Sequence, residues 1–149
     1  MTAEQVFSIA NFIALCGWVI LIMGVRFRWV PALVTGAILP LLLAVLYSFL
    51  IATHWGETTG GFRTLAQVRA LFSNDWLLLA GWVHYLAFDL FIGSWQVRDA
   101  RRNRVPFLLV LPCLLLTFLF GPIGLLLYLL LAGLISRGKA WPGHPAVVT

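Results

Sequence analysis

Residues 107–135 read FLLVLPCLLLTFLFGPIGLLLYLLLAGLI, a run that contains no charged side chain. At about 1.5 Å of rise per residue, one helix of this length would exceed the roughly 30 Å of hydrocarbon in a bilayer. Apolar runs long enough to cross a bilayer also cover residues 6–25, 31–52 and 76–95. We therefore predict an all-α integral membrane protein with four transmembrane helices at these positions.

The composition leaves little protein for a water-facing surface. Of the 149 residues, 62% are hydrophobic and only 10% are charged, whereas roughly a quarter of the residues of a soluble domain are charged. We expect a single membrane domain over residues 1–140, followed by a mobile tail over 141–149. The longest connection, residues 53–75, has apolar side chains at helical spacing in its second half. This pattern predicts a short interfacial helix between the second and third transmembrane helices.

The basic residues indicate an orientation and exclude one class of partner. The net charge is +5, but Arg and Lys cluster at the ends of the apolar runs, so we expect no nucleic acid partner. Six arginines follow the first and third predicted helices: Arg26, Arg28, Arg98, Arg101, Arg102 and Arg104. The opposite side holds four basic residues: Arg63, Arg69, Arg137 and Lys139. The positive-inside rule then places both termini away from the cytoplasm, in a multi-pass protein of a bacterial inner membrane.

The third predicted helix carries two ionisable side chains at membrane depth, His84 and Asp89. Such groups cost roughly 3 kcal/mol or more in the bilayer core and normally face the interior of a bundle. Measured from Trp76, His84 lies about 12 Å and Asp89 about 20 Å along the helix. At about 100° per residue the two side chains project about 140° apart, so a straight helix cannot direct both at one small atom. Both are candidate functional residues, with a structural hydrogen bond as the alternative for each.

Aromatic and small residues surround these two groups. Tyr85 and Gly93 flank Asp89 one helical turn away on either side, and Phe88 follows His84 at the same spacing. A long flat hydrophobic ligand would stack on such rings and approach closely at a glycine. The candidate ligand-binding residues are Trp82, Tyr85, Phe88, Gly93, Trp95 and, on the first helix, Asn11. The alternative interpretation is ordinary helix packing and anchoring at the membrane interface.

Several other kinds of site are not indicated. The chain has three histidines, too few for a membrane di-iron oxygenase, and Cys16 and Cys113 lack the spacing of zinc ligands. The sequence contains no glycine-rich phosphate loop and no serine nucleophile elbow. We therefore expect neither a metal nor a cofactor.

The third helix and its flanks carry a pattern that extends beyond hydropathy. Residues 81–93 read GWVHYLAFDLFIG and are followed by Trp95, Asp99 and the arginine cluster, with a GPIG step at 121–124. This pattern resembles the four-helix membrane family of plant neoxanthin synthesis, of the abscisic-acid-deficient type, and its bacterial relatives. The resemblance covers roughly residues 5–135, and its most specific part is the HYLAFDLF stretch.

The resemblance implies a function in carotenoid metabolism. In plants the family is associated with converting violaxanthin to neoxanthin, an isomerisation of an epoxide to an allene without net redox change. An acid must protonate the epoxide oxygen and a base must remove a proton from the polyene side, and Asp89 and His84 are suited to these catalytic roles. The protein would then be a cofactor-independent, isomerase-like enzyme that acts on an epoxy or hydroxy carotenoid in the bilayer.

Two other functions compete with this one. A non-enzymatic small subunit would bind pigment or lipid within a larger membrane complex, and four helices in so short a chain leave little room for an enclosed pocket. A small-solute carrier is disfavoured because the chain shows no inverted repeat. The expected partners are membrane lipid, a carotenoid or another long hydrophobic ligand, and further copies of the chain or a larger complex.

Overall fold

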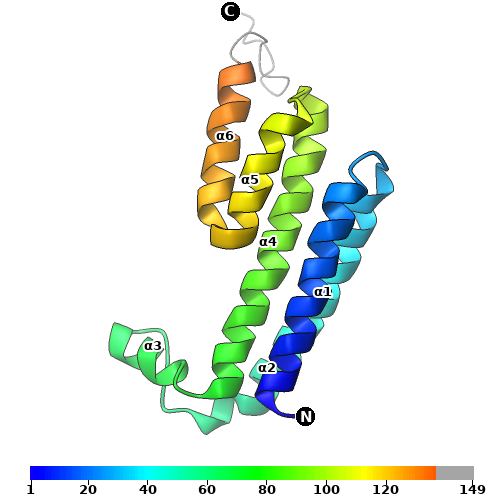
Figure 1. Cartoon of the computed structure of the whole chain (residues 1–149). Coiled ribbons are helices and arrows are strands. Elements are labelled where there is room, and N and C mark those ends of the chain that lie inside the picture. The colour runs from blue at the N-terminus through cyan, green and yellow to red at the C-terminus, as the bar shows by residue number, and fades with distance from the viewer. Residues whose placement is uncertain (137–149) are drawn as a thin grey trace, which may run out of the picture.

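The computed structural model of the protein describes residues 1–136, which form helices and no strand (Figure 1). The all-α prediction is therefore confirmed. In chain order the elements are α1 (Ala3–Met23), η1 (Val30–Ile38), α2 (Leu39–His54), η2 (Trp55–Glu57), α3 (Leu65–Leu71), α4 (Asp75–Asn103), α5 (Phe107–Phe120) and α6 (Pro122–Ser136). The tail predicted to be mobile, residues 141–149, lies outside the described residues.

Helix α4 is the central element, because α1, η1, α2, α5 and α6 all pack against it. It begins after Asn74, whose side-chain oxygen accepts hydrogen bonds from the amides of Trp76 and Leu77. This cap satisfies two amide donors that the first turn leaves free. The helix ends before Arg104, which adopts a left-handed conformation with φ of 55°. Its 29 residues give it a length of about 43 Å.

Three helical stretches are long and apolar enough to cross a membrane: α1, α4, and Val30–Glu57, which joins η1, α2 and η2. Their composition indicates membrane association. Within Val30–Glu57 the first element is a π-helix, and the amide of Leu39 donates to the carbonyl of Val34. Pro40 follows, and proline has no amide hydrogen to donate. The helix is therefore widened in the turns that precede Pro40.

The sequence predicts one membrane-crossing helix over residues 107–135, and the structure corrects this prediction. The run forms two helices, α5 and α6, which separate at Gly121 with its positive φ of 51°. They pack antiparallel as a hairpin beside α4 (Figure 1). The 14 residues of α5 span about 21 Å, roughly half the length of α4. The predicted count of four transmembrane helices is therefore not confirmed: hydropathy cannot distinguish one long apolar helix from two short ones.

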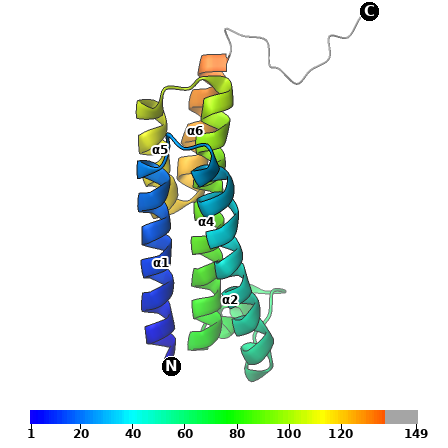
Figure 2. The ribbon, with the colours of Figure 1, turned by 90° about the vertical axis from the view of Figure 1, so that its right-hand side faces the viewer.

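The hairpin also changes where the described chain ends. Helix α6 ends at the same end of the bundle as α4 does, whereas α1 begins at the opposite end (Figures 1 and 2). Together α5 and α6 return the chain to the end of the bundle where α5 began. The prediction that both termini lie on one side of the membrane stays a prediction, because the C-terminus lies outside the described residues. Arg137 and Lys139, which contributed to that prediction, lie outside the described residues.

A short helix is present between α2 and α4, as predicted. Helix α3 follows Thr64, whose hydroxyl accepts a hydrogen bond from the amide of Gln67. Phe72, directly after α3, packs on α4 so closely that a Cβ added to Gly81 would lie 2.8 Å from its ring. Leu65 at the opposite end of α3 is 75% exposed. An exposed apolar side chain at one end of the bundle fits a helix lying in the membrane interface, and that placement stays a prediction.

Candidate functional site on the central helix

One face of α4 carries a line of polar side chains that faces the α5–α6 hairpin. Tyr85, Asp89, Gln96 and Asp99 recur at helical spacing and so lie on this one face. Tyr85 Oη donates to the carbonyl oxygen of Phe118 at 3.0 Å. Interhelical hydrogen bonds therefore hold this face against the hairpin from the level of Tyr85 upward.

Two further hydrogen-bond groups occupy the upper part of the same face. The buried Gln96 amide donates from Nε2 to Thr117 Oγ1 at 3.0 Å, and that hydroxyl in turn donates to the carbonyl of Cys113. The buried Tyr128 donates from Oη to Asp99 Oδ2 at 2.6 Å. Each of the buried polar side chains in these two groups makes a hydrogen bond, as interior polar groups generally do.

Asp89 is the exception on this face. The residue is 6% exposed, and its Oδ2 is the one buried side-chain nitrogen or oxygen among residues 1–136 that has no hydrogen-bond partner. No cation offsets its charge, since the single ion pair in this part of the chain joins His54 and Glu57. A buried polar atom without a partner is costly, and in a membrane helix an ionisable one is a functional candidate. Asp89 is therefore the strongest candidate in the described structure.

Gly121 explains how the hairpin reaches Asp89. A Cβ added to this glycine would lie 2.8 Å from Asp89 Oδ1 and 3.1 Å from Oδ2, so only a residue without a side chain lets the turn contact the carboxyl. Pro122 then begins α6, and the start of a helix carries partial positive charge. The turn thus brings backbone, and the positive end of α6, to a carboxyl in the middle of α4.

His84 lies on a different face and is exposed. Its ring stacks on Phe88 of α4, with centroids 4.5 Å apart, and approaches Tyr47 of α2 at 5.5 Å. The separation of about 140° calculated from helix geometry fits this arrangement, in which His84 faces away from the hairpin and Asp89 faces toward it. The structure does not bring the two predicted catalytic residues together.

The predicted ligand-binding residues divide between these two faces. Trp82 Nε1 donates to Asn11 Oδ1 at 3.0 Å, and the Trp82 and Tyr85 rings lie 5.2 Å apart. These three residues therefore lie on the Asp89 side, between α1 and the hairpin. Phe88 lies with His84, and Trp95 packs edge-on against Tyr128 at 5.6 Å.

Aromatic side chains occupy the space beside both glycines of the 81–93 stretch. A Cβ added to Gly93 would lie 2.5 Å from the ring of Trp18 on α1, and the corresponding space at Gly81 is taken by Phe72. The sequence predicts close approach of a flat ligand to the helix at Gly93, and in the described residues both glycines allow close packing of aromatic side chains. Whether Gly93 contributes to ligand binding stays a prediction.

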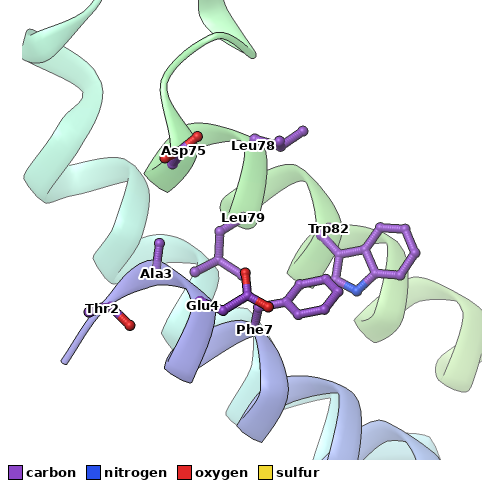
Figure 3. A pocket seen from close by; sticks show the side chains of 8 residues that line it. All are labelled: Thr2, Ala3, Glu4, Phe7, Asp75, Leu78, Leu79 and Trp82. Atoms are coloured by element: carbon purple, nitrogen blue, oxygen red, sulfur yellow. The ribbon is translucent and has the colours of Figure 1, made fainter.

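A pocket of about 500 Å³ lies on the Asp89 side of α4, near the start of that helix (Figure 3). Its apolar wall includes Phe7, Leu78 and Trp82, and Figure 3 shows the Phe7 and Trp82 rings next to each other. Glu4 and Asp75 contribute carboxylates. Leu78 and Trp82 are 52% and 40% exposed. An apolar surface thus continues along α4 from this pocket toward the hairpin turn.

Metal chemistry gains no support from the described residues. No group of three or more His, Cys, Asp or Glu side chains in residues 1–136 is placed to hold a metal ion. Cys16 and Cys113 are both free thiols in the structure.

The sequence did not predict two parts of the site, the Gly121 contact with Asp89 and the Gln96–Thr117 pair. A signal for each was present. Gln96 lies seven residues beyond Asp89 and so on its face, and the GPIG step indicates a close backbone approach. What the sequence could not supply is the reversal of the chain at Gly121.

Comparison with known protein families places the chain in one of them. The profile of a family described as ABA DEFICIENT 4-like matches residues 5–128, from α1 into α6. No curated protein and no solved structure matches the chain. The matched range includes residues 81–93 and confirms the resemblance that this stretch indicated.

Proposed function

Because this chain belongs to the ABA DEFICIENT 4-like family, we propose that it isomerises an epoxy or hydroxy carotenoid within the bilayer. The family suggests a role in a carotenoid pathway related to neoxanthin. The single observation that supports the enzymatic proposal is Asp89, a buried carboxyl with an unpartnered oxygen in the middle of the central helix. Such a group is suited to proton transfer in a site that excludes water.

The proposed reaction needs two proton transfers and no redox partner. In its protonated form Asp89 donates a proton to the epoxide oxygen as the C–O bond breaks, which leaves a hydroxyl group. A proton then leaves the adjacent polyene carbon, and its electron pair forms the new double bond of the allene. The Asp89 carboxylate produced in the first transfer can accept this second proton. Atoms and charge balance, and the carboxyl returns to its starting form.

This mechanism assigns both transfers to one carboxyl because His84 faces elsewhere. A base must lie within hydrogen-bond reach of the proton that it removes, and His84 stacks with Phe88 and Tyr47 on another face of α4. The substrate would approach Asp89 from below the hairpin turn, along the exposed surface of Leu78 and Trp82. Tyr85, one turn before Asp89, would contact the same part of the polyene.

The test is conversion of a defined epoxy carotenoid, such as violaxanthin, by purified protein in liposomes. The products are separated chromatographically and must have the mass of the substrate. We expect Asp89→Asn, which keeps the shape of the side chain, to lower the rate about 100-fold or more. His84→Phe is the matched control on the other face of the same helix and should convert at close to the wild-type rate. Full activity of a folded Asp89→Asn variant would remove Asp89 from the mechanism.

A second candidate function is a small subunit that binds pigment or lipid without converting it. The observation in its favour is the cover over Asp89, which is only 6% exposed beneath the hairpin turn. In that case the wild-type protein would carry a structured polyene absorption band after purification in mild detergent. It would also leave the epoxy carotenoid in liposomes unchanged, an outcome that contradicts the enzymatic proposal.

A further inference from the structure

A second apolar surface lies on the far side of α4 from Asp89 and has no part in the proposed reaction. It is a groove of about 380 Å³ between η1, α2 and α4. Figure 2 shows α2 and α4 side by side. No polar or charged side chain lines it; its walls include Gly36, Pro40, Ala44, Ala87, Phe88 and Phe91. Because it lies where the π-helix gives way to α2, the groove follows from the local geometry around Pro40.

The side chain of Arg98, which carries a positive charge, lies beyond one end of this groove. Ala87, Phe91 and Arg98 follow each other at helical spacing and so share one face of α4, with Arg98 about 10 Å beyond Phe91. The Arg98 guanidinium donates from Nη1 to the carbonyl of Pro31 at the start of η1. The same Nη1 lies directly over Gly36, since a Cβ added there would clash with it. Arg98 is thus fixed at the boundary between the apolar groove and the arginine-rich end of the bundle.

The remaining nitrogens of Arg98 can bind an anion. The guanidinium carries five N–H donors, of which the Pro31 carbonyl uses one. Arg102 lies one turn further along α4, at i+4, and so on the same face as Arg98. Two neighbouring arginines above a groove between membrane helices have the chemistry of a phosphate headgroup site.

We propose that this groove binds an anionic phospholipid, with one acyl chain against Phe88 and Phe91 and the phosphate at Arg98 and Arg102. The charge argument selects the occupant: a hydrocarbon polyene gains nothing from two arginines, whereas a phosphodiester gains two ionic hydrogen-bond partners. The apolar walls select a flexible chain, which can follow the irregular surface around Pro40. This site is independent of the proposed isomerase reaction and of Asp89.

Native mass spectrometry of the detergent-solubilised protein tests the site. The protein is incubated with an equimolar mixture of phosphatidylglycerol and phosphatidylethanolamine that have distinguishable acyl chains of equal length. We expect bound phosphatidylglycerol to exceed phosphatidylethanolamine about fivefold or more. Arg98→Gln should reduce this ratio toward one, Arg98→Lys should retain most of it, and Arg28→Gln at the same end of the bundle is the control that should leave it unchanged. The ratio is internal to each spectrum and does not depend on the fraction of folded protein.

A second variant tests the groove itself. Ala44 is exposed and lines the groove, so Ala44→Trp fills it with little strain and should abolish retention of the bound lipid. Equal binding of the two lipids, or an unchanged ratio in Arg98→Gln, would overturn the anionic headgroup assignment. Undiminished lipid retention in Ala44→Trp would overturn the groove as the site. Loss of a dimer or of a bound carotenoid in Ala44→Trp, without loss of lipid, would assign the groove to that occupant and contradict the proposal.

Discussion

The two ionisable groups that α4 carries at membrane depth lie in opposite surroundings. Asp89 faces the α5–α6 hairpin, is 6% exposed and touches the backbone of Gly121. His84 is exposed and lies beside the rings of Phe88 and Tyr47. The difference shows that depth along a helix is not enough to identify a site; the packing partner on each face decides it.

The surroundings of the two groups suit them to different roles. An exposed imidazole beside two aromatic rings is an ordinary amphipathic side chain. The Asp89 carboxyl packs against a turn in the middle of the bundle, where it loses its hydration, and one of its oxygens has no hydrogen-bond partner. This arrangement lowers stability, and costs of this kind are expected at functional sites. The Asp89 face is therefore the one to which we assign chemistry.

The largest expected effect is an all-or-none change in labelling that tests whether the hairpin turns back on the Asp89 face. In the described structure six arginines lie at the end of the bundle where α6 ends, whereas the other end has two, Arg63 and Arg69. We therefore propose that the arginine-rich end is cytoplasmic. In a background without Cys16 and Cys113, cysteines at Asn103 and Ile135 should both resist an impermeant thiol reagent in intact cells. A cysteine at Arg63 should be labelled.

The decisive position in this experiment is Ile135. A single helix over residues 107–135 would carry Ile135 across the membrane, and the reagent would then label it while Asn103 stayed protected. Permeabilised cells are the control, because all three cysteines should react there. Labelling of Ile135 in intact cells would contradict the hairpin and, with it, the contact between Gly121 and Asp89.

The next effect is on stability and concerns the turn itself. Gly121→Ala places a Cβ 2.8 Å from Asp89 Oδ1 at a backbone φ of 51°. We expect it to lower the free energy of unfolding by about 2 kcal/mol or more. Gly133→Ala is the matched control in α6, where an added Cβ meets nothing within 4 Å, and it should be neutral or stabilising by up to about 1 kcal/mol. Denaturant titration followed by circular dichroism in mild detergent measures both, and equal values for the two variants would contradict the turn geometry.

The smallest expected effect compares hydrogen bonds on the two sides of α4. Gln96 donates to Thr117 Oγ1 and to the carbonyl of Gly124 in the hairpin, whereas Ser94 donates to Thr35 Oγ1 in η1. Gln96→Leu should therefore cost about 1 kcal/mol and Ser94→Ala about 0.6 kcal/mol of the free energy of unfolding. A double-mutant cycle with Thr117→Val isolates the Gln96 pair. A larger loss at Ser94 than at Gln96 would mean that α4 is held more firmly by η1 than by the hairpin.

The sequence predicted the class of the fold because hydropathy and helix length depend only on local composition. It predicted the short helix before α4 for the same reason. It missed the reversal at Gly121, since Gly-Pro within an apolar run is compatible with either a kink or a turn. The choice between them depends on the partner, here Asp89, which lies 32 residues earlier in the chain.

The site was predicted in part. Helix periodicity alone separates His84 from Asp89 and groups Asp89 with Tyr85, as the structure has them. Periodicity could not determine which face α5 and α6 would cover, so the acid and base roles were assigned to two residues that do not meet. Gly93 was interpreted as a ligand contact because an intramembrane glycine fits a flat molecule as well as it fits Trp18, and only the position of α1 distinguishes the two.

Chemical modification of Asp89 tests the central claim most directly. Dicyclohexylcarbodiimide is an apolar reagent that adds to carboxyl groups in their protonated form from within the membrane, whereas a water-soluble carbodiimide reaches exposed carboxylates such as Glu4 and Asp75. We predict that the apolar reagent forms a single adduct, located at Asp89 by peptide mass spectrometry, that this adduct abolishes carotenoid conversion, and that Asp89→Asn prevents it. The contradicting result has two parts, both observed in folded, membrane-embedded protein after treatment. Asp89 stays unmodified, and carotenoid conversion continues at its normal rate. Together they would contradict the role proposed for this carboxyl.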